Sequence, residues 1–212
     1  MLACWPHGTA LVWFVGNGLD RSAAGRKSAF RPYCVCRGDH WFLMLFVGKR
    51  KSNMAKYKVI PGGVCAAKGF SASGVHAGFR ANPNKLDLAI IKADVRCAAA
   101  GVYTTNKAYG APIKVDRAHL VDGHAQAVLV NSGNANTCAA NGVDLANECC
   151  ALVAQQLGIA AEDVLPASTG VIGQPMTIDP FARGIPAAAA RLQASAEGSS
   201  EAAKAIMTTD TY

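Results

Sequence analysis

Residues 127–136 read AVLVNSGNAN, and this stretch predicts a strand that runs directly into a polar loop. The four residues 127–130 are all apolar, which favours a strand. The six residues 131–136 are only Asn, Ser, Gly and Ala, a composition typical of a loop. Its side-chain amides could bind a ligand, but such stretches more often hydrogen-bond to their own backbone.

An amphipathic helix is predicted next, over about residues 143–157. Leu145, Cys149, Val153 and Leu157 recur every fourth residue and form one apolar stripe. Gly158 stands where a helix needs a C-terminal cap. Further strands are predicted at residues 86–95, 101–105 and 163–167.

Two more helices are expected towards the end of the chain. Asp179 and Pro180 open the first, with Asp179 as N-cap and proline at the first helical position. Ser199 or Ser200 is expected to cap the last helix. Strands and helices therefore alternate, which predicts an α/β fold.

The positive charge of the chain belongs to its first 53 residues. The chain has a formal net charge of +7, and residues 1–53 hold eight of its 21 Lys and Arg but only two of its 14 Asp and Glu. The remainder is nearly neutral and lacks the basic face of a nucleic-acid-binding protein. No run of about 18 apolar residues is present, so no membrane-spanning helix is expected.

The eight cysteines are irregularly spaced, and Cys149-Cys150 is a vicinal pair. This pattern favours reduced thiols in an intracellular protein over a disulfide framework. Cys34, Cys36 and His40 could ligate a metal, but no second ligand pair follows at a suitable distance, so no metal site is predicted.

Residues 1–53 form a leader that differs in character from the rest of the chain. It matches a secretory signal poorly and a mitochondrial transit peptide only in part. The alternative is that Met54 is the true initiator and that the leader is translated upstream DNA. Residues 48–51 (GKRK) fit this alternative, because purine-only codons of a ribosome-binding site encode Gly, Lys and Arg.

Residues 168–173 (STGVIG) are the first candidate for chemistry. A strand that ends in Thr169-Gly170 can offer a hydroxyl and a backbone N–H to one point, where they would stabilise an oxyanion. The alternative is an ordinary strand-to-loop turn. Residues 207–211 (MTTDT) follow a helix, and Asp210 there could bind an amine. The alternative for that segment is a capped helix end.

Taken together, six stretches in register resemble the bifunctional ornithine acetyltransferase/N-acetylglutamate synthase family of arginine biosynthesis (ArgJ). They begin at Lys68-Gly69-Phe70, 88–91 (LAII) and 100–106 (AGVYTTN), and continue with 131–136 (NSGNAN), 168–173 (STGVIG) and 205–211 (AIMTTDT). The order and spacing agree from about Val59 to the last residue, whereas residues 1–53 have no counterpart.

The resemblance implies a layered α-β-β-α sandwich of the N-terminal-nucleophile acetyltransferase/aminopeptidase type, of which residues 54–212 would be the α-chain part. Members of the family cut themselves before a threonine that becomes the nucleophile. They move an acetyl group from N2-acetylornithine to glutamate, and bifunctional members also use acetyl-CoA as a donor substrate; no bound cofactor is implied. Thr169 and Gly170 match the family's oxyanion pair, and Thr208 matches a substrate-contacting threonine.

The family's cleavage motif, Ala-Thr-Met-Leu, does not occur in this sequence. The nucleophile and the β chain are therefore expected downstream, and this chain alone is expected to be inactive. The complete protein is expected to be a cytoplasmic α2β2 heterotetramer, or a mitochondrial one if the leader is a transit peptide. Two alternatives remain: an aminopeptidase of the same fold, and a non-catalytic module that holds an amino acid through Thr208 and Asp210.

The first testable prediction concerns the start of the chain. If Met54 is the initiator, mass spectrometry of the native protein will find its N-terminus there. Detection of a peptide that spans Arg50 to Lys56 would refute this prediction.

Overall fold

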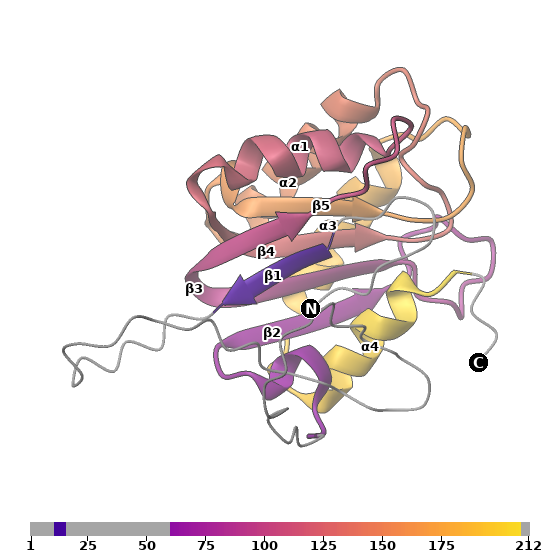
Figure 1. Ribbon diagram of the computed structural model, residues 1–212. Helices are drawn as coiled ribbons and strands as arrows, with labels where there is room; N and C mark the ends of the chain where they lie inside the picture. Colours follow the sequence, from indigo (N-terminus) through magenta and orange to yellow (C-terminus); the bar gives the residue numbers. More distant parts are fainter. Residues whose placement is uncertain (1–10, 16–59, 209–212) are drawn as a thin grey trace, which may run out of the picture.

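The computed structural model describes residues 60–208 and the backbone of residues 11–15. A five-stranded mixed sheet forms the middle layer, with three α-helices on one face and the fourth on the other (Figure 1). The elements follow in this order: β1 (Leu11–Val15), η1 (Gly63–Ala66), β2 (Phe70–Val75), β3 (Leu88–Val102), α1 (Ala111–His119), η2 (Leu120–Asp122), β4 (His124–Asn131), α2 (Gly142–Leu157), η3 (Ala161–Asp163), β5 (Val164–Ser168), α3 (Asp179–Ala190) and α4 (Ala196–Ile206). The predicted α/β class is confirmed.

The long strand β3 organises the sheet. β2 pairs with its first part and β1 with its last part, both antiparallel. β4 is also antiparallel to β3, and β5 runs parallel to β4. The parallel pair places Asn131 opposite Ser168 at the ends of the two strands.

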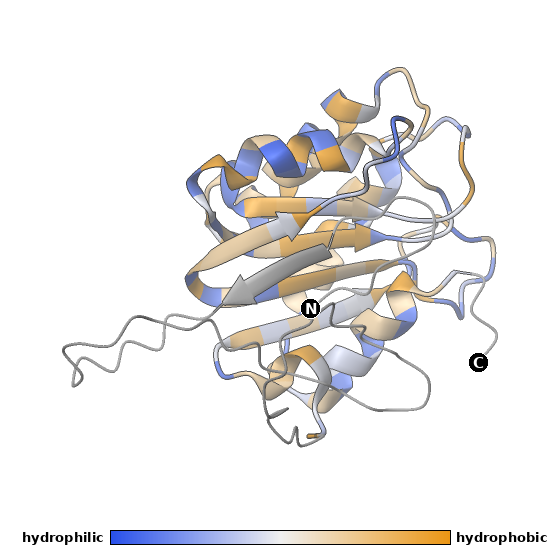
Figure 2. Cartoon of the chain, in the orientation of Figure 1, coloured by the Kyte–Doolittle hydropathy of each residue, from blue (hydrophilic) through white to orange (hydrophobic). Residues whose placement is uncertain are grey.

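Side chains of alternate strand residues pack into two separate hydrophobic cores, one on each face of the sheet. Leu88 and Ile90 of β3 pack with α2 and α3, whereas Ala89 and Ile91 point to the opposite face and pack with α4. This alternation follows from the period-two geometry of a strand. Each large aliphatic side chain removed from water contributes about 1.5–3 kcal/mol. Figure 2 shows the apolar colouring concentrated in β3, β4 and β5, between the helical layers.

Helix α4 lies unusually close to strand β2. A Cβ built on Gly74 would lie 2.3 Å from the backbone oxygen of Glu201, so any side chain there would push the helix away. Ala202 and Ala205 of α4 are both buried against the sheet. Small residues on both sides therefore set the position of α4, which carries the C-terminal candidate site.

The predicted central helix is confirmed as α2. Leu145, Cys149 and Val153 are buried, and Leu157 packs at the edge of the same core. Gly158 adopts the left-handed conformation with φ 67° and donates its N–H to the oxygen of Ala154, as a C-terminal cap does.

Other boundaries predicted from sequence were wrong. Strand β3 is continuous to Val102, so residues 101–105 do not form a strand of their own. Helix α4 is capped by Ser195, whose Oγ accepts the N–H of Gly198, and not by Ser199 or Ser200. Asp179 is the first residue of α3 and Ile178 is its N-cap residue, so Asp179 is not the cap.

Ser199 has a different role from the predicted one. Its Oγ donates to the oxygen of Gly62 at 2.8 Å and accepts the N–H of Cys65 at 3.0 Å. Its hydroxyl therefore ties α4 to η1. Tertiary contacts of this kind leave no local pattern in the sequence.

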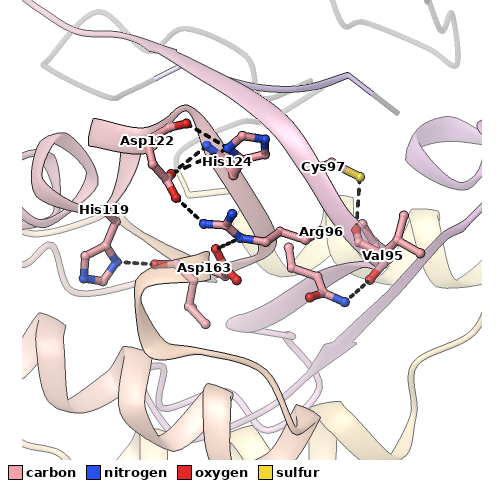
Figure 3. A network of polar contacts seen from close by, with 10 residues as sticks. Val95, Arg96, Cys97, His119, Asp122, His124 and Asp163 are labelled. Carbon is pink, nitrogen blue, oxygen red and sulfur yellow. Dashed lines mark hydrogen bonds and ion pairs between the residues drawn. The ribbon is translucent and has the colours of Figure 1, made fainter. Parts of the chain in front are cut away.

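A β-bulge interrupts the pairing of β3 with β4 between Lys92 and Cys97. Bulges re-aim side chains, and here Arg96 turns towards two carboxylates, of Asp122 and Asp163 (Figure 3). Its Nε lies 2.7 Å from Asp163 Oδ1. The network joins β3 to η2 and η3. The hydrogen bond from the Arg96 guanidinium is the main reason why the pKa of Asp122 lies below its usual value.

The five cysteines in the described part of the chain are free, including the neighbours Cys149 and Cys150. The pKa of both thiols is raised, mainly because the side chains are buried. Both thiols therefore stay uncharged and pack as apolar core residues. Cys34, Cys36, His40 and Met54 lie outside the described residues. None of the helices in residues 60–208 has the length and hydrophobicity needed to cross a bilayer.

Asp116 of α1 is a buried acid without a hydrogen-bond partner among the described residues. Its side chain is 1% exposed, and burial raises its pKa to about 8. Burial raises the pKa of Tyr103 and of Cys150, and a negative charge on Asp116 would raise both further. At neutral pH the folded chain therefore holds Asp116 mainly as the uncharged acid.

Replacing Asp116 with Asn should remove a specific pH dependence of stability. The folded state keeps the Asp116 proton up to a pH of about 8, whereas the unfolded state loses it near pH 4. The wild-type free energy of unfolding should therefore fall with rising pH through this window, by on the order of 5 kcal/mol relative to Asp116→Asn. Urea unfolding at several pH values measures the difference, and parallel pH curves for the two proteins would contradict it.

Candidate active site

The candidate site forms where the parallel strands β4 and β5 end. Because parallel strands place their carboxyl ends at the same sheet edge, the loop 131–136 and the turn 168–173 lie side by side. Their backbones remain paired beyond the strands. Thr169 donates its N–H to the oxygen of Asn131 at 3.0 Å, and Val171 donates to Gly133 at 3.1 Å. Ala135 donates back to the oxygen of Val171 at 2.8 Å.

Gly170 lies at the closest point between these two segments. Its φ is 132°, a conformation that side-chain-bearing residues rarely adopt. A Cβ at this position would lie 2.4 Å from the carbonyl carbon of Gly133 and 2.7 Å from the nitrogen of Asn134. Only glycine therefore fits between the flanking hydrogen bonds of Thr169 and Val171.

The two predicted oxyanion donors are the Thr169 hydroxyl and the Gly170 N–H. Neither has a hydrogen-bond partner among the described residues, and both residues are partly exposed to solvent. The N–H of Thr169 is already used by Asn131, so it is not a third donor. Two unpaired donors on adjacent residues have the chemistry needed to stabilise a developing negative charge, and their assignment to that role stays a prediction.

The polar side chains of the loop 131–136 hydrogen-bond to backbone groups of the loop and of its neighbours. Asn131 Nδ2 donates to the oxygen of Asn134 at 2.8 Å, and Asn136 Nδ2 donates to Gly142 at 2.7 Å. Ser168 Oγ accepts the N–H of Asn136 at 2.8 Å and donates to Asn134. These amides therefore hydrogen-bond to the backbone, which is the more common of the two expectations for this loop.

Thr208 reaches this region through the end of helix α4. Ser132 Oγ donates to the oxygen of Ala205 at 2.5 Å, and Arg80 Nη2 donates to the oxygen of Met207. The end of α4 is thus bound, through Ala205, to the loop that also pairs with Thr169, and Met207 is bound by Arg80. Thr208 itself is partly exposed. Thr209, Asp210 and Thr211 lie outside the described residues, so the expected amine contact of Asp210 stays a prediction.

Two residues of this arrangement were missed from the sequence. Arg80 connects Ser132 with Met207, and Asp87, which is fully buried, accepts the N–H groups of Ala77 and Arg80. Arg80 is 52 residues from Ser132 and 127 from Met207, so no local spacing could indicate these contacts.

The histidines lie in structural networks. His119 and His124 belong to the region around Arg96 (Figure 3), and His76 lies beside Asp87. Within the described residues no cluster of three or more His, Cys, Asp or Glu side chains is arranged to hold a metal ion. The candidate site thus consists of hydroxyl groups, backbone amides and one arginine.

The sequence profile of the ArgJ family matches residues 71–212. The arginine biosynthesis bifunctional protein ArgJ of Symbiobacterium thermophilum is 48% identical over 155 residues, which are 72% of this chain and 38% of that protein. A relative from Ricinus communis, named as chloroplastic, is 44% identical over 153 residues, 71% of this chain and 33% of its own length. The chain thus spans between a third and two fifths of these curated relatives.

Two crystal structures resemble this fold. Arginine biosynthesis bifunctional protein ArgJ from Bacillus halodurans has a TM-score of 0.67 and 40% identity, covering 71% of this chain and 78% of the other. Ornithine acetyltransferase of Mycobacterium tuberculosis, complexed with ornithine, has a TM-score of 0.68 and 36% identity, covering 71% and 81%. These similarities support the layered α/β fold class expected from sequence.

Replacing Gly170 with Ala tests how tightly the two segments are packed. The added Cβ collides with the backbone of Gly133, so we expect a loss of stability on the order of 3 kcal/mol or more. Gly173→Ala is the matched control, because Gly173 also has a positive φ, 81°, but has nothing within 4 Å of its Cβ position. It should lose only about 1 kcal/mol. Equal losses in urea unfolding would contradict the close approach at Gly170.

Proposed function

Because the chain belongs to the ArgJ family, we propose that residues 54–212 form the α-chain part of an acetyltransferase of arginine biosynthesis. The complete enzyme would move an acetyl group from N2-acetylornithine to glutamate. We keep residues 1–53 as a leader in this proposal, with strand β1 (Leu11–Val15) of the leader paired to β3.

The proposal is carried by the pair of unpaired donors at the end of β5. The Thr169 hydroxyl and the Gly170 N–H are adjacent, partly exposed and without partners among the described residues. The side-chain N–H groups of Asn131 and Asn136 and the hydroxyl of Ser168 nearby are bonded to backbone groups, whereas these two donors are not, and we assign the two to an oxyanion. In acyl transfer, such donors stabilise the tetrahedral intermediate more than the ground-state carbonyl.

The chemistry would proceed through an acetyl-threonine intermediate. The N-terminal threonine created by autocatalytic cleavage attacks the acetyl carbonyl of N2-acetylornithine, and its hydroxyl proton passes to its own amine. The carbonyl oxygen becomes negative and binds to Thr169 and Gly170. The C–N bond then breaks, the departing nitrogen takes the proton, and ornithine leaves. The glutamate amine attacks the ester in the same way, giving N-acetylglutamate and the free threonine.

We assign Thr208 to contact with the substrate. It follows the Met207 carbonyl that Arg80 binds, at the end of the helix that Ser132 ties to the loop 131–136. A relative of this fold has been crystallised with ornithine, which supports an amino-acid substrate of this class. Acetyl-CoA would be a second donor substrate, and no bound cofactor is required.

The nucleophile would come from a β chain downstream, and two α and two β chains would assemble. Val171 and Ile172, next to the donor pair, are both more than half exposed and would be covered in that assembly. Because the nucleophile would lie on the β chain, the 212-residue chain alone would be inactive.

We propose a cytoplasmic location, or an organelle if the leader acts as a transit peptide. The Ricinus communis relative, which is named as chloroplastic, is an example of an organellar member of the family.

The acetyltransferase is favoured over the aminopeptidase alternative. The relatives described above are named for arginine biosynthesis at 44–48% identity, and one solved structure is named as an ornithine acetyltransferase. An assay of the full-length protein with acetylornithine and with a peptide amide separates the two activities.

Replacing Thr169 with Ala in the full-length protein should lower kcat for acetyl transfer about 100-fold or more, because one oxyanion donor is lost. KM should change little, since this contact strengthens only in the transition state. Thr177→Ala is the matched control, because Thr177 is exposed in the same β5–α3 connection and its hydroxyl donates to the carboxylate of Asp179. The 212-residue chain gives the baseline without nucleophile. Wild-type kcat in Thr169→Ala would overturn the role of Thr169.

A further inference from the structure

We propose that Arg80 is a positioning residue of this enzyme, which fixes the direction in which Thr208 leaves helix α4. This inference rests on the proposed function of Thr208. One nitrogen of the guanidinium, Nη2, donates both to Ser132 Oγ, at 2.9 Å, and to the backbone oxygen of Met207. Arg80 thereby connects the loop beside the donor pair with the residue immediately before Thr208.

The base of the Arg80 side chain is itself held in place. The backbone N–H of Arg80 donates to Asp87 Oδ2 at 3.0 Å, and that of Ala77 donates to Oδ1 at 2.6 Å. Asp87 is fully buried and immediately precedes β3. Its backbone also donates to Val75 and accepts the N–H of Ser132 at 2.8 Å. The arginine therefore projects from a rigid corner between β2 and β3.

Ser132 completes the connection from the other side. It is fully buried, and its hydroxyl accepts from Arg80 while it donates to the oxygen of Ala205 at 2.5 Å. The preceding residue, Asn131, accepts the N–H of Thr169. The turn with the oxyanion donors and the segment that carries Thr208 thus share one support.

The electrostatics of the position suit an arginine. The last carbonyl groups of a helix lack partners within the helix and carry a partial negative charge. Ala205 presents such an oxygen to Ser132, and the next residue but one, the extended C-cap residue Met207, presents its oxygen to Arg80, which brings a cation to this helix end. No carboxylate of the described residues lies within ion-pair distance of its guanidinium, so its charge is directed at the helix end. Both bonds come from the one nitrogen Nη2, so a lysine ammonium can replace them in part.

If Arg80 acts through Thr208, its loss should weaken substrate binding more than it slows chemistry. In the full-length protein we expect Arg80→Met to raise KM for acetylornithine roughly tenfold, as for a lost hydrogen bond to a charged group, with kcat changed much less. Arg80→Lys should recover part of the affinity. In a Thr208→Ala background, Arg80→Met should raise KM little further, because the contact that it positions is already absent.

Arg191→Met is the matched control. Arg191 also holds α4, but through the side chain of Glu201 at 2.7 Å, in the middle of the helix and away from Thr208. It should leave KM unchanged. A merely structural role for Arg80 would predict that both arginine variants lose stability while KM stays at the wild-type value, and this result would overturn the proposal.

Amide hydrogen exchange gives a readout that does not depend on activity. Arg80→Met and Arg80→Lys should speed exchange in the peptide that contains Met207 and Thr208, whereas Arg191→Met should not. Unchanged exchange in the Arg80 variants would overturn the positioning role. An inactive wild-type enzyme would overturn the proposed function alone, because the exchange result still decides whether Arg80 holds this segment.

Discussion

The parallel pairing of β4 with β5 is the constraint on which the candidate site depends. It places Asn131 opposite Ser168, and the hydrogen bonds of Thr169 and Val171 extend the pairing past the strand ends. A parallel pair needs a crossover, which α2 supplies with its apolar stripe packed on the sheet. The close approach of the two segments then admits only glycine at position 170. The site is thus a consequence of the sheet and of one residue without a side chain.

Buried polar groups fix the arrangement of the segments around the candidate site. Ser132 and Asp87 are fully buried. Ser132 makes hydrogen bonds to Arg80 and Ala205, which are distant in the chain, whereas the carboxylate of Asp87 holds the nearby turn through the N–H groups of Ala77 and Arg80. A buried polar group without a partner is costly, so alternative arrangements of these segments are disfavoured. Asp116 is a contrasting case, because it is buried without a partner and is held as a neutral acid. The same physical cost therefore fixes one part of the fold and makes another sensitive to pH.

Predictions from the sequence succeeded where the pattern was local. The four-residue period of α2 and its glycine cap identified that helix, since both depend only on neighbours along the chain. Strand β3 was predicted in two pieces, because a charged bulge around Arg96 interrupts its pattern, although pairing with β4 and β1 carries it to Val102. Strand β2 and helix α1 were not predicted at all. The cap of α4 was misplaced because several serines compete locally, and tertiary contacts assign Ser199 to η1.

The sequence by itself determined the α/β class, the central helix, and the family, because periodicity and short motifs survive without knowledge of long-range contacts. It also indicated Thr169, Gly170 and Thr208 as candidate residues, but only within separate sequence motifs whose relative position in space it did not give. The tertiary structure decided that these segments are held together, that the side-chain amides of the loop 131–136 bond backbone carbonyl groups inside the loop and next to it, and that Arg80 joins the segments. The physical reason is that hydrogen bonds between residues more than 50 positions apart depend on chain geometry, which no local pattern encodes.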